Sequence, residues 1–171
     1  MEAMPTRLRA LLFGNGVGLM VLAVVIGWIW MFALLHKIVL WPLPFDIPVS
    51  IPDDGRAWRM AHVEAITEGL LLMAIGLGGQ FMRLSRTQFT WLFWSSLVTG
   101  WLFSVPPIFN ALFGTRGLAF GGGPFKDGVA NNVIYLFGWP PVVAVHIMLG
   151  LTAWGVWRFL KTETRVISKA G

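Results

Sequence analysis

The sequence contains no cysteine. Disulfide bonds, thiolate metal sites and cysteine nucleophiles are therefore excluded from its chemistry. Charged residues are also scarce, at 12% of the chain where a soluble domain has about 25%, while hydrophobic residues make up 56%. A small water-soluble fold has no room to hide so much apolar surface. The composition therefore indicates that a lipid bilayer is the solvent for most of the chain.

Acidic residues are outnumbered by basic ones, 8 Asp and Glu against 13 Lys and Arg, which gives a net charge of +5. The basic residues lie at the ends of apolar segments and form no basic face with interleaved aromatic residues, so we expect no nucleic-acid partner. A chain of 171 residues suits a single domain and, at about 20 apolar residues per span, four helices. We expect residues 1–171 to form one transmembrane domain.

The apolar segments predict an all-α fold, an integral membrane four-helix transmembrane bundle. The first segment is longer than a signal-peptide core and is followed by no small-residue cleavage site, so we interpret it as a retained span. Proline residues predict an extended loop between the first two helices, a kink or early end in the third at Pro106-Pro107, and a kink in the fourth at Pro140-Pro141. The expected helices cover about residues 8–35, 56–82, 88–113 and 129–160.

The distribution of basic residues predicts the orientation of the bundle. Eight lie at one set of helix ends and five at the other, and the richer side is expected to face the cytoplasm. We therefore expect cytoplasmic N- and C-termini and a multi-pass location, in the bacterial inner membrane. The eight are Arg7, Arg9, Arg83, Arg86, Arg158, Lys161, Arg165 and Lys169, and the five are Lys37, Arg56, Arg59, Arg116 and Lys126.

Three ionisable residues within the second predicted span are functional candidates, because a charged group inside a bilayer costs several kcal/mol. Glu64 and Glu68 are one helical turn apart, whereas His62 and Glu68 are separated by about 240° around the helix axis. A site that uses all three therefore needs another helix or another subunit. Histidine is the commonest metal ligand, although a hydrogen bond to a neighbouring helix would also explain His62. Arg116 or another outer arginine would explain Glu64, and the deeper Glu68 is the better catalytic candidate.

His146, in the fourth predicted helix, suggests a haem with two histidine ligands. The two histidines differ in depth by about 15 Å, however, at 1.5 Å per residue. His146 is therefore expected to serve packing or hydrogen bonding.

Three segments resemble a known family. The sequence from Ala61-His62 to Glu68-Gly69 is similar to the alanine-histidine, five residues, asparagine-glycine signature of styrene oxide isomerase and the related hydroxylaminobenzene mutases. Gly100-Trp101 and the segment 115–121 also look similar to the isomerase. These relatives are small membrane proteins with four spans, so the resemblance extends over the whole chain.

The resemblance implies a homotrimer that binds haem b between its subunits, with His62 as the axial ligand of the iron. Ferric iron would act as a Lewis acid on a small hydrophobic epoxide, which would rearrange to an aldehyde. Arg59 and Arg116 are candidates to bind the haem propionates, and Trp58 to pack against the ring. Glu68 and Glu64 are the candidate catalytic residues.

Two positions depart from the family pattern. The asparagine six residues after the histidine is Glu68 here, and the substrate-contacting tyrosine of the isomerase would align near Pro107, while Tyr135 is the only tyrosine of this chain. The identity of the substrate therefore stays open, and the N–O substrates of a hydroxylamine mutase are an alternative to an epoxide. Two functions of another class also stay open: a haem protein for electron transfer or sensing, and a carrier or scaffold in which Glu64 and Glu68 line a polar path.

Overall fold

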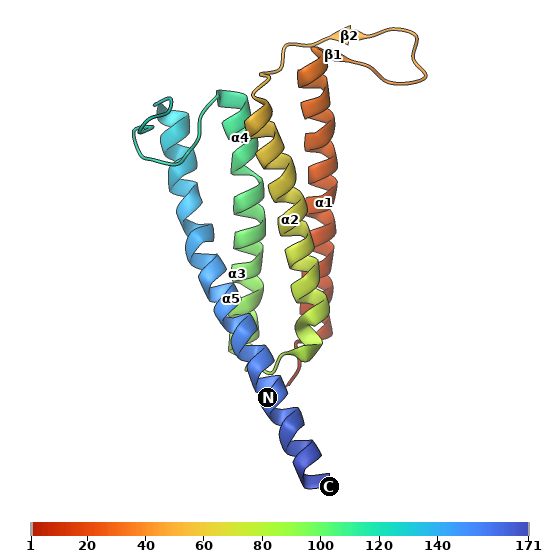
Figure 1. Cartoon of the computed structure of the whole chain (residues 1–171), viewed down its shortest axis with the longest axis vertical. Coiled ribbons are helices and arrows are strands. Elements are labelled where there is room, and N and C mark those ends of the chain that lie inside the picture. Colours follow the sequence, from red (N-terminus) through yellow and green to blue (C-terminus); the bar gives the residue numbers. More distant parts are fainter. Residues whose placement is uncertain (1, 171) are drawn as a thin grey trace.

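The computed structural model describes the backbone of residues 2–170 and the side chains of residues 2–162. It confirms the predicted bundle, because four helical segments are long and apolar enough to cross a membrane. Figure 1 shows them side by side. The helices are α1 (Thr6–Leu35), α2 (Gly55–Gly78) followed by the 3-10 turn η1 (Gly79–Phe81), α3 (Arg86–Ser104), α4 (Pro106–Phe113) and α5 (Val129–Ala170).

The third span is broken where the sequence predicts it. The helix α3 ends at Ser104, Val105 forms a bend, and α4 begins at Pro106. Because proline has no backbone N–H, it is tolerated at the first position of a helix but not in its interior. The last helix, α5, contains Pro140 and Pro141 in its interior, as expected, and extends to Ala170, ten residues beyond the expected end. The kink expected at these two prolines stays a prediction.

Local residue chemistry sets the other helix boundaries. Asp54 caps α2 by accepting a hydrogen bond from the Ala57 backbone N–H at 3.0 Å. The helix α3 begins with a capping box in which Ser85 and Gln88 exchange backbone and side-chain hydrogen bonds. The loop expected after α1 contains a short antiparallel pair, β1 (Lys37–Ile38) with β2 (Ile47–Pro48).

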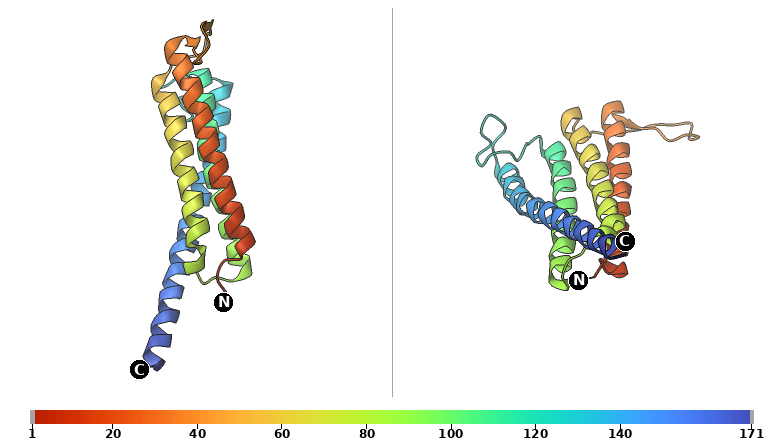
Figure 2. Two further views of the ribbon diagram at one scale, coloured as in Figure 1. Left: turned by 90° about the vertical axis from the view of Figure 1, so that its right-hand side faces the viewer. Right: turned by 60° about the horizontal axis from the view of Figure 1, so that its bottom comes forward.

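The described chain begins and ends at the same end of the bundle, and the β1–β2 loop and the glycine-rich loop 114–128 lie at the other (Figure 1). Figure 2 shows α5 continuing past the other helices at the terminal end. The basic residues that we expect on the cytoplasmic side thus belong to one end. Two residues of that count, Arg165 and Lys169, lie outside the part of the chain whose side chains are described. That the terminal end faces the cytoplasm stays a prediction.

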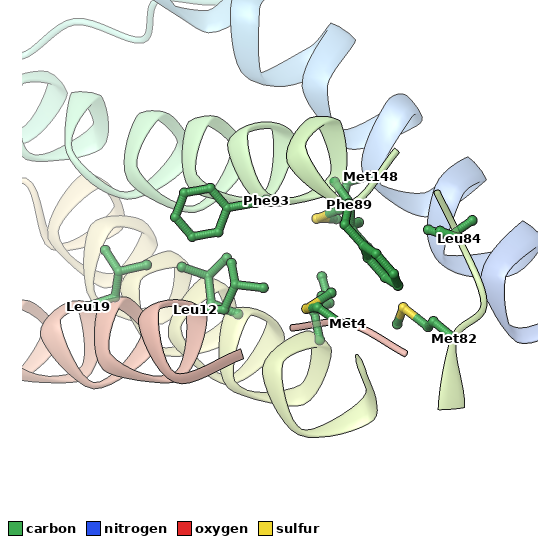
Figure 3. Close-up of a cluster of buried hydrophobic side chains, with 11 residues drawn as sticks. Met4, Leu12, Leu19, Met82, Leu84, Phe89, Phe93 and Met148 are labelled. Atoms are coloured by element: carbon green, nitrogen blue, oxygen red, sulfur yellow. The ribbon is translucent and has the colours of Figure 1, made fainter. Parts of the chain in front are cut away.

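The bundle core has two parts. Near the chain termini, large side chains from α1, α2, α3 and α5 form a cluster (Figure 3) that includes Leu12, Leu72, Phe89, Leu92 and Met148. Toward the loop end, the buried cluster is made mostly of alanines from α1 and α2. Because small side chains let two backbones approach closely in a membrane, α1 and α2 form a tight pair, and the ring of His62 lies between them.

Candidate functional site

The ring of His62 lies against α1. Its Nδ1 atom is 2.9 Å from the carbonyl oxygen of Ala23, and its ring centre is 6.3 Å from that of Trp30. Gly27 makes room for the imidazole, since an ideal Cβ there would lie 3.1 Å from Cε1 and 3.3 Å from Nδ1 of His62. Real Cβ contacts are rarely this short, so any larger residue at position 27 would displace the ring.

The contact with Ala23 fixes the tautomer of His62. A carbonyl oxygen only accepts hydrogen bonds, so Nδ1 must donate and carries the proton. In the neutral ring Nε2 is then the unprotonated nitrogen, and the described residues offer it no hydrogen-bond partner. Histidines that bind metals are held in the same way, by donating the other ring N–H to a carbonyl or carboxylate. The chain thus presents His62 Nε2 ready for ligation.

The described residues gather no group of three or more His, Asp or Glu side chains that could hold a metal ion. The described residues of one chain therefore do not support a metal site made of protein side chains alone. A haem iron needs less from the protein, because the macrocycle supplies four nitrogen ligands and the chain adds one or two axial ones. The histidine held between α1 and α2 fits the haem predicted from the sequence.

The two glutamates of α2 have few interactions. Glu68 is half-buried, and its Oε2 atom is buried without a hydrogen-bond partner among the described residues. Glu64, one turn earlier, accepts a hydrogen bond from the Thr67 hydroxyl at its backbone carbonyl, but its carboxyl group has no ion pair or hydrogen bond among the described residues. The sequence allowed Arg116 as a partner of Glu64, but the guanidinium of Arg116 pairs with Asp54 at 2.9 Å. Both carboxyl groups therefore remain available for other interactions.

A cavity of about 390 Å³ lies between α2, α3, α4, α5 and the glycine-rich loop. Most of its wall is apolar, and polar side chains enter it from three directions: Glu64 from α2, Asn110 from α4 and Tyr135 from α5, with Arg116 at the loop. A mainly apolar pocket with a few convergent polar groups is the usual form of a small-molecule site.

Arg116, in the wall of this cavity, forms an ion pair with Asp54 at the start of α2. The two side chains are each about a quarter exposed, at 25% and 26%. Burial by itself would raise the pKa of Asp54, but hydrogen bonds from the Ala57 N–H and from Arg116, together with the charge of Arg116, hold it below its ordinary value of 3.8. Asp54 therefore joins the start of α2 to the glycine-rich loop through a charged contact.

Trp58 and Arg59 have different surroundings from each other. Trp58 is completely buried, and its Nε1 donates to the Pro52 carbonyl at 2.7 Å. It therefore packs the chain's own core and anchors the loop before α2, which leaves no exposed face for the ring of a cofactor and corrects its expected role. Arg59 is exposed on α2 near the loop end, which leaves it available to an anionic group.

The predicted candidates do not converge within one chain. Glu64 and Arg116 line the same cavity, whereas His62 contacts α1. His146 lies elsewhere, beside Gln88 and Trp91 between α3 and α5, and its Nδ1 is 2.7 Å from the carbonyl oxygen of Val142 in its own helix. The structure thus brings no second histidine to His62 within the part of the chain that it describes.

Sequence reasoning missed the residues that complete these sites. Ala23 and Gly27 position His62, but the pairing of α1 with α2 cannot be read from either segment alone. The cavity position of Tyr135 was also unforeseen. Asn110 carried a signal, because an amide inside an apolar span is a costly residue that needs a reason.

Comparison with known proteins adds one finding. The chain matches the family model described as styrene oxide isomerase over residues 8–157, which is most of its length. No curated protein sequence matches it.

Proposed function

The chain belongs to the styrene oxide isomerase family, and from this premise we propose that it is a haem b-dependent membrane isomerase. Its substrate would be a small hydrophobic epoxide that rearranges to an aldehyde. The family supports an isomerase acting on epoxides. The observation that carries the haem part of the proposal is the hydrogen bond from His62 Nδ1 to the Ala23 carbonyl, which leaves Nε2 free.

His62 is the residue that would hold the haem, through Nε2. The Ala23 carbonyl keeps the proton on Nδ1 and stops the ring from rotating, and Gly27 gives the ring its space. Arg59, exposed at the loop end of α2, is the cation left for a propionate, since Arg116 is engaged by Asp54. When bound, ferric haem supplies a Lewis acid that polarises an epoxide oxygen.

The rearrangement itself needs no redox partner. One C–O bond of the epoxide breaks, a hydrogen moves with its electron pair to the neighbouring carbon, and the remaining C–O bond becomes a carbonyl. The protein must keep water from the cationic carbon, and the largely apolar spans provide such a dry environment. Glu68 is the side chain proposed to contact the substrate, because its Oε2 is buried and unpaired and can accept a hydrogen bond or, if protonated, donate one.

We further propose a homotrimer with its sites at subunit interfaces. Within one chain His62 faces α1 while Glu68 lies on another side of α2, so a second subunit is needed to bring a carboxyl group to the iron. Much apolar surface also remains exposed on the single chain, for example at Val21, Val24 and Leu70. Light scattering of the detergent-purified protein would measure the mass, and a monomer that is fully active would contradict this arrangement.

The test of the proposed function is the absorption spectrum of the purified protein beside two single variants. His62→Ala should lose or strongly shift the Soret band, and His146→Ala should keep it, because His146 lies between α3 and α5, away from the proposed haem ligand. The wild-type protein should then convert styrene oxide to phenylacetaldehyde without added reductant or oxidant. Haem-free protein after expression with ample haem would contradict the proposal, as would an unchanged Soret band in His62→Ala.

A further inference from the structure

The cavity between α2, α4 and α5 lies on a different side of α2 from the ring of His62, and the proposed iron site does not account for it. Its volume of about 390 Å³ falls within the range of about 300–1,000 Å³ that is common for small-molecule sites. The aromatic rings of Phe103, Tyr135 and Trp139 line the wall. A small hydrophobic molecule therefore fits it in size and polarity.

Asn110 places an unused hydrogen-bond donor in this wall. The residue is 6% exposed, and its Oδ1 accepts a hydrogen bond from the Thr115 hydroxyl at 2.9 Å. That contact fixes the orientation of the amide and leaves the Nδ2 group without a partner among the described residues. Because Asn110 lines the cavity, this donor is open to an acceptor atom of a molecule bound there.

Glu64 places an unused acceptor in the same cavity. Its carboxyl group has no hydrogen bond or ion pair among the described residues, and Arg116, the nearby cation of the cavity wall, is held by Asp54. At least one oxygen of a carboxyl group accepts hydrogen bonds in either protonation state. The cavity thus offers one donor from α4 and one acceptor from α2, between apolar walls.

We propose that this cavity binds a small hydrophobic molecule that carries one hydroxyl group. The hydroxyl oxygen accepts a hydrogen bond from Asn110 Nδ2, and the hydroxyl hydrogen is donated to the Glu64 carboxyl group. A hydroxyl group is neutral and can both accept from an amide and donate to a carboxyl group. The proposal does not depend on the iron, because no residue of the cavity contacts the ring of His62.

The experiment uses fluorine NMR on the full-length protein with three probes of nearly the same shape. They are phenylethanol, its methyl ether and ethylbenzene, each with one fluorine on the ring. The alcohol can donate and accept, the ether can only accept, and the hydrocarbon can do neither. Since a net hydrogen bond changes affinity by roughly two- to tenfold, we expect the alcohol to bind more tightly than the ether, and the ether more tightly than ethylbenzene.

Two substitutions separate the two hydrogen bonds. In Asn110→Leu the ether should bind no better than ethylbenzene, because its acceptor has lost its donor. In Glu64→Leu the alcohol should bind no better than the ether, because its hydrogen has lost its acceptor. An alcohol preference that survives in both variants would overturn the proposal.

Gly138 allows the cavity to be filled without disturbing the fold. It lines the cavity, and a Cβ placed there has no neighbour within 4 Å. Gly138→Phe should therefore abolish saturable binding of all three probes. The matched control is Gly150→Phe on the same helix, where a Cβ is equally free but faces another part of the protein, and it should bind as the wild type does. Binding that persists in Gly138→Phe contradicts the assigned location.

The His62→Ala variant distinguishes this inference from the proposed function. Its probe binding should match that of the wild type even where its Soret band is lost. A wild-type protein that contains haem but shows no alcohol preference would overturn the hydroxyl site and leave the isomerase proposal intact. A haem-free protein that binds the alcohol more tightly than the ether, and the ether more tightly than ethylbenzene, would overturn the isomerase proposal and leave the hydroxyl site intact.

Discussion

Gly27 of α1 leaves the space that the His62 ring of α2 occupies where the two helices meet. The ring occupies the space that a side chain at position 27 would need, and an ideal Cβ would approach Cε1 to 3.1 Å. The hydrogen bond to the Ala23 carbonyl depends on the same ring position. The orientation of Nε2, and with it the proposed haem ligation, therefore depends on a residue that has no side chain.

We expect Gly27→Ala to weaken haem binding. Overpacking costs about 1–3 kcal/mol, which corresponds to a loss of affinity of about fivefold or more. The measurement is the haem content per chain together with the Soret position. Gly14→Ala on the same helix is the control, because a Cβ there meets nothing within 4 Å, and it should keep the wild-type spectrum. Equal haem content in the two variants would show that the ring does not need this space.

Asp54 and Asp46 both lie at the loop end, and each forms an ion pair with one basic side chain, so the two ion pairs can be compared. Lys37 holds the pKa of Asp46 low through a hydrogen bond and its charge, but that ion pair is about half exposed, at 47% and 48%. The pair of Asp54 with Arg116 is less exposed, at 26% and 25%. Since exposed ion pairs contribute little, only the Asp54 contact should matter for stability.

We expect Asp54→Asn to lower the free energy of unfolding at pH 7 by about 1 kcal/mol, and Asp46→Asn to leave the melting temperature unchanged. The pKa of Asp54 in the folded protein is below its ordinary value of 3.8. Its contribution is therefore fully present above that value and is lost as the pH falls through the lower folded pKa. The melting temperatures of wild type and variant should begin to converge as the pH falls below about 4. A constant difference between pH 7 and pH 3 would contradict this role.

At the level of elements, α1 and α2 are held together by glycines that let their backbones touch. An ideal Cβ on Gly16 would lie 2.5 Å from the Gly69 carbonyl oxygen, and one on Gly76 would lie 2.8 Å from the carbonyl oxygen of Arg9. Backbone cannot move aside as a flexible side chain can. The two helices would therefore have to separate to admit even one methyl group.

We expect Gly16→Ala to lower the free energy of unfolding by about 2 kcal/mol or more, as overpacking of a tight contact does. Gly14→Ala should be neutral or slightly stabilising, because alanine has the higher helix propensity. Thermal unfolding in detergent compares the two variants on one helix. Equal melting temperatures would mean that the α1–α2 contact is looser than the structure shows.

The sequence predicted the elements better than their contacts. Apolar length and composition gave the four spans, and the missing amide of Pro106 gave the break in the third, because both effects are local. The close approach of Gly27 to His62 and the cavity position of Tyr135 depend on which helices pack together. The choice of His62 and Glu68 as candidates came from their cost in an apolar span, which says that a residue has a role but not what it contacts.

At the scale of the whole molecule, the single chain leaves most of its outer helices uncovered. In the most apolar stretches of the first and last spans, only 22% of the residues are buried inside the chain, against 44% in the third. Lipid or neighbouring copies must cover the rest. The proposed trimer would use part of this surface, while the remainder faces the bilayer.

The orientation of the whole bundle can be tested because the chain has no cysteine. The structure places the connection between η1 and α3 at the terminal end and the β1–β2 loop at the opposite end (Figure 1). Phe45 is exposed in the β1–β2 loop, and Thr87 is exposed in the first turn of α3, next to the connection. Since the terminal end carries more basic residues, it should stay in the cytoplasm. In intact spheroplasts a membrane-impermeant maleimide should label Phe45→Cys but label Thr87→Cys only after permeabilisation, while the wild-type chain stays unlabelled. The opposite pattern would invert the bundle and place the loop end, with Arg59, on the cytoplasmic side.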